Sequence, residues 1–318
     1  MSTYIIAEAG VNHNGSMDMA RELVDVAADA GADAVKFQTF RAEALVSESA
    51  PKANYQLETT EAEETQSDML RALELSPDQH QAIVDHCEKR DIQFLSTPFD
   101  AQSATFLVDT FGVPRIKVPS GEITNGPLLL HIARLGRPVI LSTGMSTLGE
   151  VEDALAVLAY GYSGQKESPT RAMLQRALAS EQGQQHLADN VTVLHCVTEY
   201  PAPVETVNLR VMDTLRQAFD LPVGLSDHTL GTAIPIAAVA RGAVLVEKHF
   251  TLDRSLEGPD HRASLEPGAL REMVKGIRDV EHALGQSRKV PIGPEWENRK
   301  TARKSLVATA PIEKGETL

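Results

Sequence analysis

The chain has 318 residues, of which 42% are hydrophobic and 23% are charged, proportions that are ordinary for a soluble globular protein. A formal net charge of −14 at pH 7 argues against a nucleic-acid or membrane-surface partner. Two cysteines argue against a disulfide scaffold, and neither a signal peptide nor an apolar run long enough to span a bilayer is visible, so we expect a cytoplasmic protein.

Eight short apolar runs, each closing on polar residues or glycine, predict eight β-strands. They cover residues 4–10, 34–40, 93–99, 115–121, 138–144, 191–197, 222–228 and 244–250. The segments between them have helical periodicity with recognisable ends. Gly31 ends the first of these segments, Ser76 and Pro77 start a later one, and Thr147 and Glu150 have capping-box spacing.

Strand and helix alternate eight times, which predicts parallel strands, and eight is the number that closes an α/β (β/α)₈ TIM barrel. A doubly wound open sheet is the alternative, ranked lower because no G-x-G-x-x-G follows the first strand. We expect the barrel, as a catalytic domain, over residues 1–285. Residues 286–318 contain prolines, a basic run and a strand-like "SLVATA", which predict a linker and the incomplete start of a second domain.

Two connections in the predicted barrel are long. Residues 41–75 are acidic and polar, with a short helix expected near "TQSDMLRAL", and could form a lid over a site. Residues 159–190 read as a polar insertion with one helix, which we interpret as surface decoration.

Polar side chains end all eight predicted strands. They are Glu8, Lys36, Gln38, Thr97, Lys117, Ser120, Ser142, His195, Ser226, His228, Glu247 and His249. The carboxyl ends of the strands of a barrel meet at one mouth, where active sites lie. Because residues two apart face the same side of a strand, Glu247 and His249 are expected to face the mouth and Lys248 to face away.

These residues suggest two chemistries. Two cations and four hydroxyl groups suit a phosphate: Lys36, Thr97, Lys117, Ser120, Ser142 and Ser226. His228 and His249 end consecutive strands and could share a metal ion completed by water and substrate oxygens, which favours Mn²⁺ over structural zinc. Two hydrogen-bonded histidines without a metal are the alternative.

The sequence also resembles the N-acetylneuraminate (sialic acid) synthase family, which includes legionaminic and pseudaminic acid synthases. The motifs are "IIAEAGVNHNGS", "AVKFQTF", "LSTPF", "IKVPSGE", "ILSTGM", "LHCVTEYPAP", "GLSDHT", "VEKHFTLD" and "GPDHRASLEP". The resemblance implies a (β/α)₈ barrel that condenses phosphoenolpyruvate with an N-acetylated hexose, such as N-acetylmannosamine. The products would be a nine-carbon 2-keto acid and phosphate, and the reaction would need a divalent cation, Mn²⁺ first, with Co²⁺ or Mg²⁺ as alternatives.

Carried over by motif, the resemblance implies that the six phosphate-suited residues bind phosphoenolpyruvate and that His228 and His249 are metal ligands. It places Gln38, Glu122, Tyr200 and Asp260 in the sugar site. The catalytic candidates are then Glu122, Glu247, His228 and His249. Glu122, Glu247 and Asp260 stay open as the carboxylate that moves protons.

Two departures from the family pattern stand out. Some members carry glutamate in an "NHEG" form of the first loop, where this chain has Asn14. Members also continue into an antifreeze-like (SAF) domain, which reaches the partner's active site with an arginine in a swapped dimer. Here "RKSLVATAPIEKGETL" resembles only its opening, so either the chain is truncated or the sugar site is closed in another way. The swapped dimer of the family implies a homodimer.

Three alternatives to N-acetylneuraminate synthesis stay open. The first is legionaminic acid synthesis from 2,4-diacetamido-2,4,6-trideoxymannose, ranked after N-acetylmannosamine. The second is a Schiff-base pyruvate aldolase with Lys117 or Lys36 as nucleophile, which leaves the histidine pair unexplained. The third is a non-catalytic protein that binds an anion or a sugar.

Overall fold

Eight parallel strands form one sheet in the computed structural model, which describes residues 2–46 and 65–317. They are β1 (Tyr4–Gly10), β2 (Ala34–Thr39), β3 (Gln93–Pro98), β4 (Ile116–Val118), β5 (Val139–Ser142), β6 (Val191–Cys196), β7 (Val223–Asp227) and β8 (Leu245–His249). In the order β3-β2-β1-β8-β7-β6-β5-β4, β8 pairs with β1, and every other strand except β3 pairs with the next in sequence. β3 and β4, at the two ends of this order, lie in contact without a hydrogen-bonded ladder among the described residues. The predicted (β/α)₈ barrel is confirmed, with the eight strands where the sequence pattern placed them.

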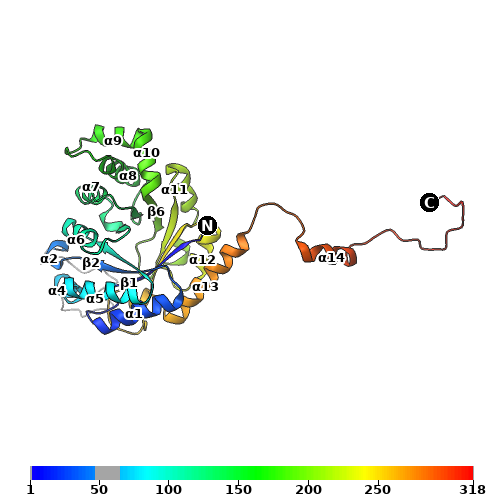
Figure 1. The fold of residues 1–318 in the computed structure, drawn as a ribbon, viewed down its shortest axis with the longest axis horizontal. Helices are drawn as coiled ribbons and strands as arrows, with labels where there is room; N and C mark the ends of the chain where they lie inside the picture. The colour runs from blue at the N-terminus through cyan, green and yellow to red at the C-terminus, as the bar shows by residue number, and fades with distance from the viewer. Residues whose placement is uncertain (1, 47–64, 318) are drawn as a thin grey trace. The chain divides into compact units, whose positions relative to one another are not determined.

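Helices surround the strands (Figure 1). They are α1 (Met17–Ala30), α2 (Ala42–Leu45), α4 (Gln66–Leu73), α5 (Pro77–Lys89), α6 (Ala101–Phe111), α7 (Gly126–Arg134), α8 (Leu148–Tyr162), α9 (Arg171–Ala179), α10 (Glu181–Asn190), α11 (Val211–Phe219), α12 (Ala233–Ala240) and α13 (Pro267–Leu284), with 3₁₀ turns at Ser120–Glu122, Val204–Thr206 and His261–Ala263. The predicted ends are confirmed: Ser76 and Thr147 form capping boxes, and Gly31 ends α1 at φ 79°.

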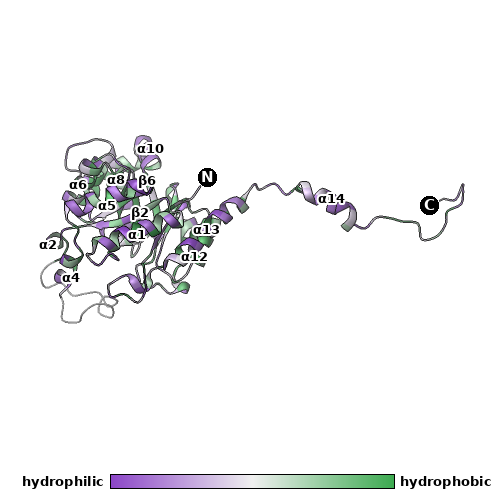
Figure 2. Ribbon diagram, turned by 60° about the horizontal axis from the view of Figure 1, so that its bottom comes forward, coloured by the Kyte–Doolittle hydropathy of each residue, from purple (hydrophilic) through white to green (hydrophobic). Residues whose placement is uncertain are grey.

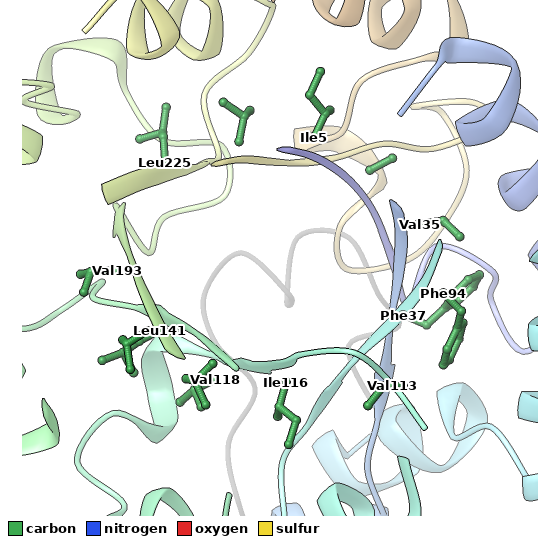
Figure 3. Close-up of a cluster of buried hydrophobic side chains, with 14 of the residues drawn as sticks. Ile5, Val35, Phe37, Phe94, Val113, Ile116, Val118, Leu141, Val193 and Leu225 are labelled. Atoms are coloured by element: carbon green, nitrogen blue, oxygen red, sulfur yellow. The ribbon is translucent and has the colours of Figure 1, made fainter. Parts of the chain in front are cut away.

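The apolar core lies mainly between the strands and the helices. Figure 3 shows residues such as Ile5, Val35 and Leu225 pointing outward from the ring of strands toward the helices. A smaller cluster fills the barrel interior: Ile6, Ala34, Leu95, Ile140, Leu194 and Leu245. The helix ribbons carry both hydrophilic and hydrophobic stretches (Figure 2), as amphipathic helices packed on a sheet require.

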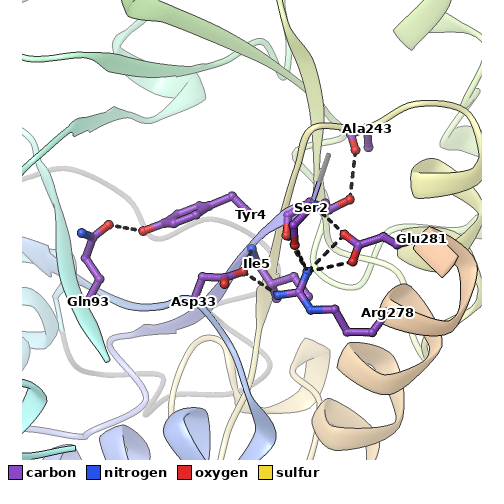
Figure 4. Close-up of polar contacts among 9 residues, drawn as sticks. Ser2, Tyr4, Ile5, Asp33, Gln93, Ala243, Arg278 and Glu281 are labelled. Carbon is purple, nitrogen blue, oxygen red and sulfur yellow. Dashed lines mark hydrogen bonds and ion pairs between the residues drawn. The ribbon is translucent and has the colours of Figure 1, made fainter. Parts of the chain in front are cut away.

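Arg278 ties the last barrel helix to the first two strands at the amino-terminal end of the barrel (Figure 4). Its guanidinium donates to the Thr3 carbonyl at 2.8 Å and to Asp33 Oδ2 at 2.8 Å. Asp33 Oδ2 also accepts from the Ile5 backbone N–H at 2.7 Å. These contacts secure the closure of the barrel at the end away from the mouth.

The insertion after α8 contains two helices, so the prediction of one helix was wrong. Ser180 ends α9 and caps α10, accepting from the Gly183 N–H at 3.0 Å. A Cβ at Gly183 would lie 1.9 Å from the Ala177 carbonyl oxygen, so only glycine permits this close turn. The predicted helix near residue 66 is confirmed as α4, while much of the proposed lid, residues 47–64, lies outside the described residues.

The chain divides into two compact units, Met1–Ala283 and Leu284–Leu318. The second unit contains α14 (Gly293–Ala302). The strand-like residues 305–310 form no strand within the part of this unit that the structure describes, because a strand needs a neighbour to bond. The SAF-like start therefore stays a prediction. None of the helices in residues 2–46 and 65–317 combines the length and apolar composition that crossing a membrane requires.

Candidate active site

A cavity of about 380 Å³ opens at the carboxyl ends of the strands. Most of its polar lining comes from all eight strands or the residues just after them, and from the β8–α13 loop. These residues are Glu8, Lys36, Gln38, Thr97, Lys117, Ser120, Ser142, Cys196, Thr198, Tyr200, Ser226, His228, Glu247, His249 and Asp260. The fold thus brings every sequence-predicted site residue except Glu122 to one cavity.

Four buried charged residues form the floor of this cavity, each at most 5% exposed. Lys36 Nζ lies 2.5 Å from Glu8 Oε2 and 3.6 Å from Glu247 Oε2. Lys117 Nζ lies 3.3 Å from Glu247 Oε1. Both ammonium groups line the cavity, so an anionic ligand can reach them in a setting of low dielectric.

The two carboxylates of this floor have opposite pKa shifts. Burial raises the pKa of Glu8 to about 7, although Lys36 opposes the change. Burial also disfavours ionised Glu247, but Lys117 and Lys36 outweigh it and lower the pKa of Glu247 to about 2. Burial disfavours charged Lys36 as well, yet its attraction to Glu247 and Glu8 raises its pKa. Glu247 is therefore a fixed anion, whereas Glu8 can exchange a proton near neutral pH.

Hydroxyl groups surround these charges. Thr97 Oγ1 accepts from Lys36 Nζ at 2.8 Å, and Ser226 Oγ donates to Glu247 Oε1 at 2.9 Å. Ser142 Oγ is buried and has no hydrogen-bond partner among the described residues. A buried hydroxyl without a partner at a cavity wall is a candidate ligand contact.

Gly144 allows Ser120 to sit close to the strand that ends at Ser142. Its backbone N–H donates to Ser120 Oγ at 2.9 Å. A Cβ at this position would lie 2.1 Å from Thr198 Oγ1 and 2.7 Å from Ser120 Oγ. Glycine is therefore required at this part of the cavity wall.

Two imidazoles stand beside the charged floor, with ring centroids 5.4 Å apart. His228 Nδ1 lies 2.6 Å from the Val197 carbonyl, which can only accept, so Nδ1 carries a proton and Nε2 has the lone pair when the ring is neutral. Burial disfavours charged His228, but Cys196, the Val197 carbonyl and Glu247 outweigh it and raise its pKa. The ring of Tyr200 lies 4.1 Å from that of His228. His249 Nδ1 is buried without a hydrogen-bond partner in the described part of the chain, and Asp260 Oδ2 is 3.8 Å away.

This pair fits a weakly held divalent ion. Burial lowers the pKa of His249 well below its usual value, so the imidazole is neutral and offers a lone pair. Residues 2–46 and 65–317 contain no cluster of three or more His, Cys, Asp or Glu placed to hold a metal. Two nitrogens completed by water and substrate oxygens suit an exchangeable ion such as Mn²⁺, and they do not fit a closed zinc site with four protein ligands.

The β8–α13 loop brings Asp260 to the cavity, and Asn14 of the β1–α1 loop holds it there. Asn14 Nδ2 donates to the Glu257 carbonyl at 2.8 Å, and Asn14 Oδ1 lies 3.1 Å from His261 Nε2. A Cβ at Gly258 would lie 2.9 Å from Asn14 Oδ1, which shows how closely the loops approach. Burial raises the pKa of Asp260 to about 6.

The outer wall of the cavity is apolar. Much of it belongs to α4 and its neighbours: Val11, Leu45, Val46, Met69, Leu70, Leu73 and Phe99. Several of these residues form a packed cluster of their own, separate from the barrel core. A bound ligand would thus meet charges at the floor and hydrocarbon at this part of the wall.

Two sequence-derived placements need correction. Glu122 lies on the 3₁₀ turn after β4, outside the cavity lining, and its Oε2 accepts from Asn125 Nδ2 at 2.7 Å. His195, one of the predicted strand ends, faces away from the mouth and its Nε2 bonds the Val207 carbonyl at 2.5 Å. Cys196 lines the cavity instead.

The sequence carried a signal for the residues that were missed. Leu194 fills the barrel interior, so the two-residue period of the strand directs Cys196 inward and His195 outward. Glu8 was recognised as a strand end but was given no role. Its pairing with Lys36 follows from the neighbouring parallel strands β1 and β2, in which Glu8 lies opposite Lys36.

Comparison with known proteins shows the family of this chain. The sequence profile of the NeuB family matches residues 23–289. The chain belongs to the NeuB family. It is 48% identical over 314 residues to N,N'-diacetyllegionaminic acid synthase of Campylobacter jejuni, covering 99% of this chain and 87% of that protein. It is 44% identical to the enzyme of that name from Legionella pneumophila, covering 99% and 82%.

A solved structure shares the fold of this NeuB family member. The sialic acid synthetase of Leptospira borgpetersenii, crystallised with citrate, has a TM-score of 0.76 and 31% identity, covering 95% of this chain and 91% of that one. The resemblance to the sialic acid synthase family is therefore confirmed. The named relatives are synthases, so the chain belongs to a family of enzymes.

Proposed function

We propose that this protein condenses phosphoenolpyruvate with an N-acetylated amino sugar and water to give a nine-carbon 2-keto acid and phosphate. The observation that carries the proposal is the buried floor of Lys36, Lys117 and Glu247 beside two imidazoles at the barrel mouth. Membership of a family of sugar-acid synthases supports it.

Phosphoenolpyruvate would bind at the charged floor. Lys36 and Lys117 offer two cations, and Thr97, Ser120, Ser142 and Ser226 offer hydroxyl groups. Ser142 Oγ, which has no hydrogen-bond partner in the described part of the chain, would donate to a ligand oxygen. Glu247 contacts both ammonium groups and Glu8 contacts that of Lys36, so these carboxylates hold the two cations in place beside the cavity.

His228 and His249 would hold the divalent cation, Mn²⁺ before Co²⁺ or Mg²⁺. Such an ion supplies Lewis-acid polarisation of the sugar aldehyde. The Val197 carbonyl orients the His228 imidazole, and burial keeps His249 neutral.

In the proposed reaction, C3 of phosphoenolpyruvate attacks the aldehyde carbon, water adds at C2, and the C–O bond to phosphate breaks. Lys36 and Lys117 stabilise the charge on the departing phosphate. Among the carboxylates, Asp260 and Glu8 suit proton transfer, with pKa values raised to about 6 and about 7. Glu247 suits it poorly as a fixed anion, and Glu122 lies outside the cavity lining.

A Schiff-base aldolase is less well supported. A nucleophilic lysine must be neutral, whereas the pKa of Lys36 is raised by Glu247 and Glu8 despite its burial.

For the acceptor we propose 2,4-diacetamido-2,4,6-trideoxymannose ahead of N-acetylmannosamine, reversing the order that the sequence suggested. The apolar wall of Met69, Leu70 and Leu73 suits a sugar with a 6-methyl group and two acetamido methyls. The relatives with 48% and 44% identity are named as legionaminic acid synthases. The inferred homodimer and cytoplasmic location stay predictions.

Acceptor choice can be measured as kcat/KM for the two sugars with phosphoenolpyruvate and Mn²⁺. A methyl group on an apolar wall gives about 10- to 200-fold discrimination, so we expect at least about a tenfold preference for the trideoxy sugar. Leu70→Gln should narrow this preference, while Leu148→Gln, an exposed residue outside the cavity lining, should not. A preference for N-acetylmannosamine would restore that sugar as the first-ranked acceptor and would not contradict the proposed synthase reaction.

Asn14→Ala should damage use of the sugar more than use of phosphoenolpyruvate. The change removes the two contacts that Asn14 makes to the Asp260 loop, and a misplaced contact group costs up to about 100-fold in rate. We expect kcat/KM for the sugar to fall about 10- to 100-fold. Asn190→Ala, at the end of α10, is the control. An equal fall in affinity for phosphoenolpyruvate would contradict this role.

A further inference from the structure

We propose that Asp227 and Lys248 are positioning residues that set the spacing of the two cavity imidazoles from the opposite side of the sheet. The inference rests on the proposed function, in which His228 and His249 hold a divalent cation. Neither Asp227 nor Lys248 lines the cavity, and the reaction proposed above uses neither.

The two residues alternate with the site residues along neighbouring strands. Lys248 stands between Glu247 and His249 on β8, and Asp227 stands between Ser226 and His228. Asp227 and Lys248 lie opposite each other in the parallel register of β7 and β8. Their side chains therefore leave the sheet on the face away from the mouth.

The pair is fully buried there. Lys248 Nζ lies 2.5 Å from Asp227 Oδ2, and the two residues are 0% and 2% exposed. Lys248 Nζ also donates to the Thr229 carbonyl. One ammonium group thus contacts the residues on both sides of His228.

Asp227 completes a closed set of contacts around His228. Its Oδ1 accepts from the Thr229 N–H at 3.1 Å, and its Oδ2 accepts from the Thr229 hydroxyl at 3.0 Å. The backbone before and after His228 is tied to one lysine, which is the chain neighbour of His249. A change in this pair must move one imidazole relative to the other.

Stability alone explains the pair poorly. Burying two charges costs several kcal/mol per ion, and replacing a buried ion pair by uncharged residues of similar volume is often neutral or stabilising. A buried ion pair is directional, however, and fixes a distance and an angle that apolar contacts leave adjustable. Contacts of this supporting kind change metal affinity about 10- to 100-fold when they are lost.

The test compares Mn²⁺ affinity with thermal stability in the full chain. The variant is Asp227→Asn with Lys248→Met, which removes both charges, nearly keeps both volumes, and leaves an acceptor for the Thr229 N–H. Calorimetric titration of the metal-free protein with Mn²⁺ should show a Kd about 10- to 100-fold weaker than wild type, while metal-free affinity for phosphoenolpyruvate changes less than about threefold.

Two further variants separate a positioning role of the pair from a role in stability alone. Arg278→Met breaks the Asp33 contact at the other end of the barrel and should lower the melting temperature without changing the Mn²⁺ Kd. Thr229→Val removes one contact to Asp227 at constant size and should weaken Mn²⁺ binding by a smaller factor, which keeps the test usable if the double variant does not fold.

An unchanged Mn²⁺ Kd in the folded double variant, or in Thr229→Val alone, would overturn the positioning role. His249→Ala identifies the site being titrated. If wild type and His249→Ala bind Mn²⁺ equally, the metal site itself is wrong and this inference falls with it. Weaker Mn²⁺ binding in the double variant and in Thr229→Val, lost binding in His249→Ala and normal binding in Arg278→Met would support both the metal site and the positioning role.

Discussion

His249→Ala should abolish both metal dependence and turnover while leaving binding of phosphoenolpyruvate nearly unchanged. The imidazole is neutral and buried, and its Nδ1 has no hydrogen-bond partner among the residues that the structure describes. Its removal takes away one of only two proposed nitrogen ligands. A metal acting as a Lewis acid supplies several kcal/mol of transition-state stabilisation. Each 1.36 kcal/mol is a factor of ten in rate, so turnover should fall by at least about 100-fold.

Phosphate release at saturating substrates, with and without added Mn²⁺, measures this loss. Calorimetric affinity for phosphoenolpyruvate should stay within about threefold, because its proposed contacts come from Lys36 and Lys117. His282→Ala, an exposed histidine at the end of α13, is the matched control. Retained metal-stimulated turnover in His249→Ala would contradict the assignment of the metal to this residue.

Lys117→Ala should weaken binding of phosphoenolpyruvate itself. The ammonium group is buried, lines the cavity floor and lies 3.3 Å from Glu247 Oε1. Removing one member of a buried charge pair costs about 2–5 kcal/mol. That range corresponds to a Kd roughly 30- to several-thousand-fold weaker.

Calorimetric titration with phosphoenolpyruvate, in the absence of metal and sugar, gives the affinity directly. Lys275→Ala removes an exposed lysine of α13 and should leave the Kd unchanged. Mn²⁺ affinity of Lys117→Ala should also stay near that of wild type, which separates the two halves of the site. Equal phosphoenolpyruvate affinity in Lys117→Ala and wild type would contradict the assignment of the phosphate site to the cavity floor.

Much of the site follows from strand periodicity in the sequence. The eight strands were found from apolar runs, and a parallel barrel places their carboxyl ends together. That reasoning correctly directed Glu247 and His249 into the mouth and Lys248 away from it. These results depend only on the two-residue period and on the closure of the sheet.

The remaining features depend on contacts between segments far apart in the chain. Glu122 sits on a short turn where its carboxylate bonds Asn125, and its motif did not reveal that it lies outside the cavity lining. The clamp between Asn14 and His261 joins the first and last loops of the barrel. The break at Ser180 required a glycine three residues later, which helical periodicity alone does not single out.

The most direct test of the account is phosphate release from phosphoenolpyruvate in the presence of the diacetamido sugar and Mn²⁺. Matched reactions lack the sugar, replace it with N-acetylmannosamine, or contain EDTA. The account predicts release that requires both an amino sugar and the metal, with a 2-keto acid formed in equal amount. Release that persists without sugar or in EDTA, or no release with either sugar, would contradict it.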